Sequence, residues 1–88
     1  MRRLPRRVHF GRDYSIAIHV VPPKFFKERY GETLAGAFEN VLGKPNGVSG
    51  HIYIRASLSA AQKRATYWHE LMHALHDIAA WDAHKLRT

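Results

Sequence analysis

The sequence predicts a single α+β domain in which a short antiparallel or mixed sheet of about three strands packs on two helices. Three observations support this prediction. Short stretches alternate as half-buried strands do, two longer stretches repeat apolar residues at helical spacing, and the 88 residues suffice for one domain, 1–88. The chain has no cysteine, so no disulfide supports its small core.

Three stretches have the composition and alternation of strands. Residues 6–12 alternate weakly, whereas residues 14–21 alternate clearly and are rich in β-branched side chains. The sequence Gly-Arg-Asp at 11–13 has turn chemistry and predicts a hairpin between them. Residues 51–56 form the third predicted strand, after a loop at 44–50.

Apolar residues recur at helical spacing from Phe26 to Leu42, which predicts a first helix after the two prolines at 22–23. Gly31 lies inside this stretch and is expected to break or kink the helix. Gly43 has the residue type that commonly caps a helix C-terminus.

The last helix has the clearest start in the sequence. Ser59 and Gln62 match a capping box, in which each side chain satisfies a free backbone donor. There is no glycine or proline from Ala60 to about Ala80, and the helix is expected to end soon after that. Tyr67 is interpreted as a packing or surface residue. A helical wheel predicts that one apolar stripe faces the core: Ala61, Ala65, Trp68, Met72, Leu75 and Ala79.

The sequence His-Glu-Leu-Met-His at 69–73 lies beside that stripe. Its two histidines are about 40° apart around the helix, with Cβ atoms roughly 6 Å apart. Imidazoles at this spacing can hold one tetrahedral Zn²⁺ at about 2.0–2.1 Å. Glu70 then stands beside the metal, where it can take a proton from zinc-bound water. The alternative is a helix that merely carries surface histidines, in a chain with seven of them.

A catalytic zinc needs a third protein ligand. His76 is about 7.5 Å along the axis from the middle of the pair, so it is interpreted as a core-edge or outer-shell residue. Asp77 is rotated about 80° from the first histidine and is expected to orient a ligand imidazole. Because the helix is expected to end before Asp82, the chain could fold back there. Asp82 is the first candidate for the third ligand and His84 the second. Histidines on the predicted strands are further alternatives: His9, His19 and His51.

Residues 50–77 resemble the core of phage- and prophage-encoded zinc metallopeptidases related to the ImmA/IrrE type, which are zincins. The resemblance rests on a strand of the form I-x-I at 52–54, a Leu-Ser linker at 58–59, and a helix with H-E-x-x-H-A at 69–74. It implies a minimal zincin-like domain with His69 and His73 as zinc ligands and Glu70 as general base. It also implies that strand 52–54 forms the sheet edge beside the cleft, where an extended substrate could pair.

The resemblance further implies a zinc-dependent peptidase that acts on a protein or peptide in the cytoplasm, that of the host cell if the chain is phage-encoded. Larger relatives supply a third ligand, typically a glutamate, from a further helix. Here no glutamate follows Glu70, so either Asp82, His84 or a second subunit would complete the ligand set, or the set stays incomplete. A donor for the oxyanion is also needed, and its candidates are Tyr53, His76 and His84.

The formal net charge is +7, and a basic arm occupies residues 1–7 with Arg2, Arg3, Arg6 and Arg7. Such an arm attracts nucleic acid, so non-specific nucleic-acid contact, or a substrate that is itself DNA-bound, is a predicted partnership. No apolar run approaches the roughly 20 residues of a membrane span, and the start does not resemble a secretory signal. The alternative function is a non-catalytic zinc-binding module that acts by binding protein or nucleic acid.

Overall fold

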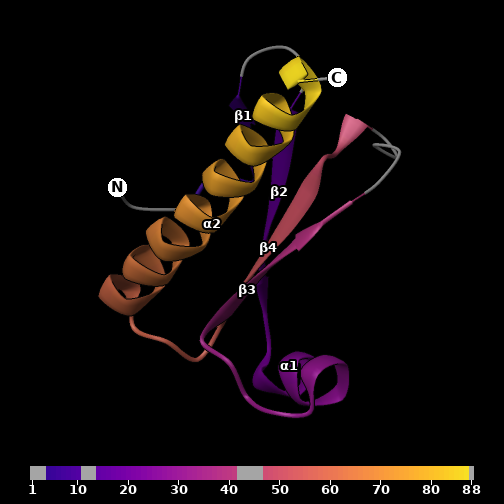
Figure 1. Ribbon diagram of the computed structural model, residues 1–88. Coiled ribbons are helices and arrows are strands. Elements are labelled where there is room, and N and C mark those ends of the chain that lie inside the picture. Colours follow the sequence, from indigo (N-terminus) through magenta and orange to yellow (C-terminus); the bar gives the residue numbers. More distant parts are fainter. Residues whose placement is uncertain (1–3, 11–13, 42–46, 88) are drawn as a thin grey trace.

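The computed structural model describes residues 4–10, 14–41 and 47–87, with side chains described as far as residue 77. Its elements are β1 (Arg7–Phe10), β2 (Tyr14–Val21), α1 (Pro23–Tyr30), β3 (Gly36–Asn40), β4 (Gly50–Arg55) and α2 (Ala60–Arg87). Figure 1 shows α2 lying along one face of the sheet and α1 at one end of it. The predicted α+β class, with two helices, is therefore confirmed, but the sheet has four strands rather than about three.

The sheet is mixed, with the strand order β1-β2-β4-β3. β1 pairs with β2 and β3 with β4 in antiparallel fashion, while β2 and β4 are parallel. The predicted pairing of residues around Val8 with residues 14–21 is confirmed, with Val8 opposite Ile16. The predicted turn at 11–13 and the predicted cap at Gly43 lie outside the described residues.

The stretch predicted as one helix from Phe26 to Leu42 is wrong in its second half. The helix α1 ends at Gly31, whose φ of 80° is left-handed and whose N–H bonds to the Lys27 carbonyl at 3.0 Å. The chain then forms β3, in which Phe38 stands opposite Ile52 of β4. Pairing with β4 overrides the helical spacing, because propensity is weak beside tertiary contacts.

The edge strand also differs from the prediction. Ile52 and Ile54 belong to β4, which lies between β2 and β3 and is therefore central. The strand at this edge of the sheet is β3, which the sequence did not reveal. Within the described residues its outer side pairs with no strand, so alternate backbone N–H and C=O groups there are available to an added strand.

The hydrophobic core lies between the sheet and α2. It is formed by Ile16, Ile18, Ile52, Ile54, Tyr67, Leu71 and Ala74. The strand residues alternate, so that one face of the sheet supplies the isoleucines. Val20, which the alternation also assigned to this face, is 50% exposed.

The buried face of α2 is rotated by about 100° from the predicted stripe. Leu71 is 5% exposed and Tyr67 4%, whereas Trp68, Met72 and Leu75 are 56%, 70% and 43% exposed. Apolar residues cover an arc of about 180° on this helix, so their spacing alone could not decide which half of the arc packs. Tyr67, interpreted as packing or surface, packs in the core.

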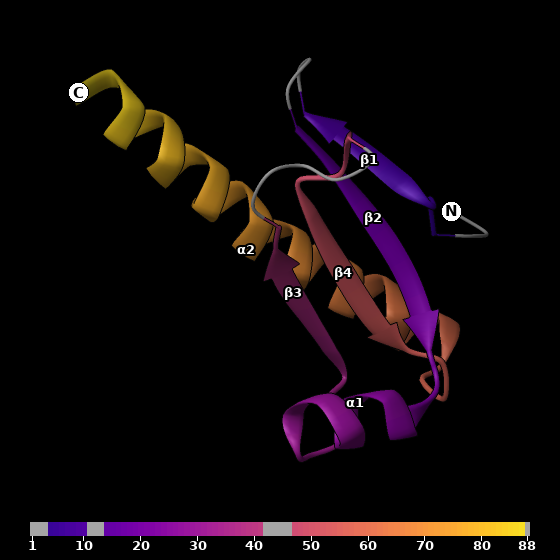
Figure 2. The ribbon, with the colours of Figure 1, turned by 90° about the vertical axis from the view of Figure 1, so that its right-hand side faces the viewer.

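The predicted start of α2 is confirmed. The Ser59 N–H donates to Gln62 Oε1 at 2.9 Å, and the Gln62 N–H donates to Ser59 Oγ at 3.2 Å. The expected end near Ala80 is wrong, since α2 continues to Arg87. Its last turns are rich in helix-forming alanine, leucine, lysine and arginine, and Figure 2 shows them extending past the sheet. No helix in the described part of the chain is both long and apolar enough to cross a membrane.

Candidate metal centre

The imidazoles of His69 and His73 converge on the exposed surface of α2. Their Nε2 atoms are 3.2 Å apart, and the rings are nearly perpendicular with centroids 4.7 Å apart. The i,i+4 spacing of the helix brings the two side chains together, and α2 is held in place by its buried face. The predicted juxtaposition of this pair is therefore present in the fold.

The separation of the two nitrogens suits a zinc ion. At Zn–N distances of about 2.0–2.1 Å, two ligands of a tetrahedron are about 3.3–3.4 Å apart, close to the 3.2 Å between the Nε2 atoms. The same distance also permits a hydrogen bond between the rings. His69 and His73 are thus a preformed pair of nitrogen donors, open to solvent on their outer side.

Glu70 is 8% exposed and lies between α2 and the edge strand β3. A Cβ built on Gly36 of β3 would overlap the Thr66 methyl group and lie 3.3 Å from Glu70 Cγ. Glycine at position 36 therefore lets the helix approach the strand closely at the level of the motif. None of the hydrogen bonds or ion pairs between described residues engages the Glu70 carboxylate, which leaves it available to an incoming group.

Asp77 accepts a hydrogen bond from Asn40 Nδ2 at the end of β3. The sequence predicted that this carboxylate would orient a ligand imidazole, whereas its partner is a strand residue. Its role in the structure is to tie α2 to β3, one turn beyond His73. Helix, Glu70 and strand edge are thus fixed relative to one another at two points.

The third ligand is not identified by the structure. Among the described residues, no group of three or more histidine, aspartate or glutamate side chains is placed to hold a metal ion. His76 is exposed. Asp82 and His84 lie where side chains are not described. Because α2 is continuous, their backbone is about 13 and 16 Å along the axis from His73, and the expected fold-back does not occur.

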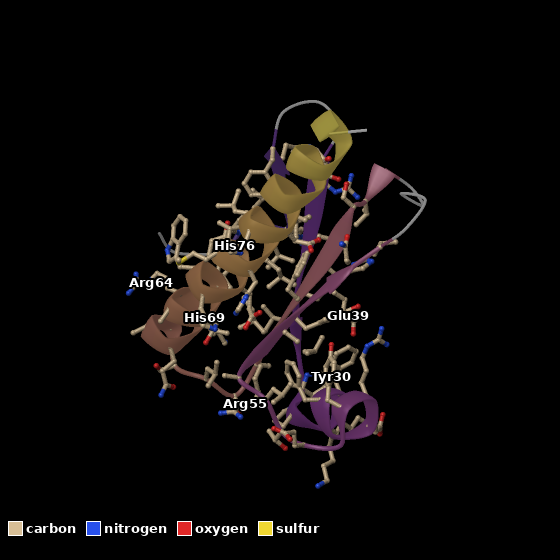
Figure 3. All side chains as sticks on the ribbon, viewed as in Figure 1. Tyr30, Glu39, Arg55, Arg64, His69 and His76 are labelled. Carbon is tan, nitrogen blue, oxygen red and sulfur yellow. The ribbon has the colours of Figure 1, made fainter. Side chains whose placement is uncertain are left out.

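The other predicted site residues are on the far side of the sheet. Tyr53 stands opposite His19 in β2 and Ala37 in β3, so it shares their face and not that of Ile52. It is therefore separated from the histidine pair by the sheet itself, and it cannot serve as the oxyanion donor there. His19 and His51 are on the same far face, and Figure 3 shows His69 and Glu39 on opposite sides of the sheet.

That far face carries a polar cluster that the sequence reasoning missed. Arg29 of α1 makes two hydrogen bonds to the Glu39 carboxylate, at 2.5 and 2.6 Å, and the Tyr30 hydroxyl donates a third at 2.5 Å. The bonds from Arg29 hold the pKa of Glu39 below its ordinary value. Burial, together with the bond to Glu39, raises the pKa of Tyr30 to about 12. The sequence signal that could have revealed this cluster is the strand-like alternation of residues 36–40, but these residues were predicted to be helical.

Comparisons with known proteins leave the family open. No family model, no curated protein and no solved structure matches this chain.

Proposed function

We propose that this protein is a zinc-dependent peptidase. The observation that carries the proposal is the pair of convergent imidazoles together with Glu70, the next residue along α2, whose side chain lies beside Gly36 of the edge strand β3 and has no hydrogen-bond partner among the described residues. Histidine and glutamate are residue types that hydrolytic zinc sites use. A second histidine pair exists on the far face of the sheet, but it has no free carboxylate beside it, since Glu39 is bound by Arg29.

A zinc ion held by His69 and His73 would supply a water of pKa near 7 and a Lewis acid for the scissile carbonyl. Glu70 takes the proton of the attacking water and delivers it to the leaving amine. The Glu70 side chain lies on the side of α2 that faces β3, which is the side where a substrate peptide would bind. An extended peptide pairs with the outer edge of β3 by β-augmentation, which brings its backbone alongside Glu70.

The test compares zinc binding with hydrolysis of an unstructured protein such as casein. Glu70→Gln should keep zinc and lose about 10²–10⁴-fold in rate, the usual contribution of a general base. Glu28→Gln, which neutralises an exposed carboxylate on α1, is the matched control and should leave the rate unchanged. His69→Ala should lose zinc, whereas His76→Ala, an exposed histidine on the same helix, should keep it.

The lack of a third donor among the described residues favours one other function, a zinc-binding module without catalysis. A non-catalytic module makes the opposite prediction for Glu70→Gln, which should then leave the rate of hydrolysis unchanged. If zinc-loaded wild type and Glu70→Gln show the same rate of hydrolysis, or none, the peptidase proposal is wrong and the module remains.

A further inference from the structure

The sheet has a second face that α2 does not cover, and α1 meets this face only at one end, where Phe25 and Arg29 lie against Tyr53. Residues directly opposite each other in neighbouring strands share a face. The register places these side chains away from α2, on what we call the open sheet face: Arg7, His9, Ala17, His19, Ala37, Glu39, His51 and Tyr53. In Figure 2 the sheet lies in front of α2, and α1 is at its lower end.

A row of four rings crosses the middle of the open sheet face and reaches α1. His19 Nε2 is 2.9 Å from His51 Nδ1. The Tyr53 ring is 5.1 Å from that of His19 and 4.6 Å from that of Phe25, with planes inclined by 22° and 36°. All four rings are half-buried, so each is braced by its neighbours and still reaches the surface. This arrangement is a rigid platform of flat groups.

The charge around the row is positive. Glu39 is the only acidic residue in the four strands, and Arg29 and Tyr30 already bind it. Arg7 is exposed on β1. Arg55, two residues after Tyr53 on β4, donates from Nη1 to the Leu34 carbonyl at 3.5 Å and has a buried Nε without a partner among the described residues. The whole chain carries a formal charge of +7, so the platform lies in a cationic field.

We propose that the open sheet face binds single-stranded nucleic acid, with unpaired bases against the ring row and phosphates near Arg7. Aromatic side chains combined with cations on an exposed surface are the arrangement by which proteins hold single strands. This activity is separate from the peptidase site, because the sheet lies between the two. It also differs from contact through the rest of the predicted basic arm, residues 1–6, because Arg7, which was predicted to belong to that arm, lies in β1.

The choice of occupant follows from the combination of rings and charge. A duplex presents phosphates but keeps its base faces stacked and covered. It would therefore contact the arginines and make no stacking contact with the rings. An acidic polypeptide matches the charge but has few flat groups to place on the row. An unpaired strand uses both features, and the pairing of flat rings with cations is sequence-tolerant.

The experiment measures fluorescence anisotropy of labelled oligo-dT and oligo-rU of about 12 nucleotides, at several salt concentrations. Comparison of the two probes tells DNA from RNA. Tyr53→Leu should weaken binding about 5- to 150-fold, the range for loss of one stacking contact, while Tyr53→Phe, which keeps the ring, should bind like wild type. Arg7→Gln should lower the slope of log K against log salt by about 0.7. Its matched control is Arg64→Gln, which removes an exposed charge from α2 and should leave the slope unchanged.

Several results would overturn the proposal. Wild-type affinity in both Tyr53→Leu and Arg7→Gln would do so. Loss of binding on deletion of residues 1–3 alone would also do so, because it would assign nucleic-acid binding to the basic arm. Equal affinity for a duplex of the same length, or for poly-glutamate, would assign the face to another partner. If Tyr53→Leu does not fold, the comparison of Arg7→Gln with Arg64→Gln decides, because both side chains are exposed.

Discussion

The imidazole of His19 lies where protonation is unfavourable. Burial lowers the pKa of this residue below its ordinary value of 6.5, and the neighbouring His51 lowers it further by charge repulsion. Tyr53 faces the same ring. The folded protein therefore favours neutral His19, whereas the unfolded chain takes up a proton near the ordinary value.

This difference predicts a loss of stability in mild acid. Where the unfolded state binds more protons than the folded state, the free energy of unfolding falls as the pH falls. We expect the His19 contribution to be present above about pH 7 and to be lost as the pH drops through 6.5 and below. Urea unfolding between pH 7.5 and 5 should show a weaker decline in His19→Gln than in wild type. The control, His76→Gln, should keep the full decline, and an equal decline in both variants would contradict the assignment.

Gly36 is the residue on which the approach of α2 to β3 depends. We expect Gly36→Ala to lower the free energy of unfolding by about 1–3 kcal/mol, the usual range for overpacking, because the added Cβ overlaps the Thr66 methyl group. Thr66→Ser removes that methyl group and should recover part of the loss in the double variant. A purely additive double-mutant cycle would mean that the two residues do not meet.

At the scale of elements, the sequence predicted what depends on local chemistry and missed what depends on pairing. The capping box, the glycine break at Gly31 and the convergent histidines all follow from spacing within one element, and the structure contains each of them. The edge strand β3 follows from its pairing with β4, which helical spacing in the same residues concealed. The prediction of the third ligand depended on where α2 ends. Because no helix breaker follows Ala80, the helix continues to Arg87.

The packed face of α2 could not be chosen from spacing, and two leucines test the choice that the structure makes. Leu71 and Leu75 are one helical turn apart, yet they are 5% and 43% exposed. Leu71→Ala should cost about 2–4 kcal/mol in the free energy of unfolding, whereas Leu75→Ala should cost less than about 1 kcal/mol. If Leu75→Ala cost more than Leu71→Ala, the apolar stripe predicted by the helical wheel would be the packed face. The measurement is chemical denaturation of both variants side by side.

At the scale of the whole molecule, the described hydrophobic core contains neither His69 nor His73. The core joins the sheet to Tyr67, Leu71 and Ala74, and the two histidines stand one turn apart on a single helix. A metal bound to that pair alone therefore links no separate parts of the chain.

Removal of zinc should accordingly leave the protein folded. We expect unchanged far-ultraviolet circular dichroism at room temperature after chelation, and likewise in His69→Ala, with only the modest fall in Tm that loss of a bound ligand brings. Cooperative unfolding on chelation would show instead that a further part of the chain holds the metal, as in a structural zinc module.

The parallel ladder between β2 and β4 has a consequence for the order in which this domain folds. Each antiparallel pair joins nearby residues, Val8 to Ile16 and Phe38 to Ile52, whereas the parallel ladder joins Ile18 to Ile52 across a longer stretch of chain. Closing the longer loop loses more chain entropy and is the slower kind of contact to form. Ile18→Val removes one methylene group from the core side of this ladder and keeps the rest of the contact. It should therefore change mainly the unfolding rate in stopped-flow measurements. His19 comes from one antiparallel pair, and His51 and Tyr53 from the other. The ring row therefore does not exist until the two halves of the sheet meet, and it is completed in the same late step as the core.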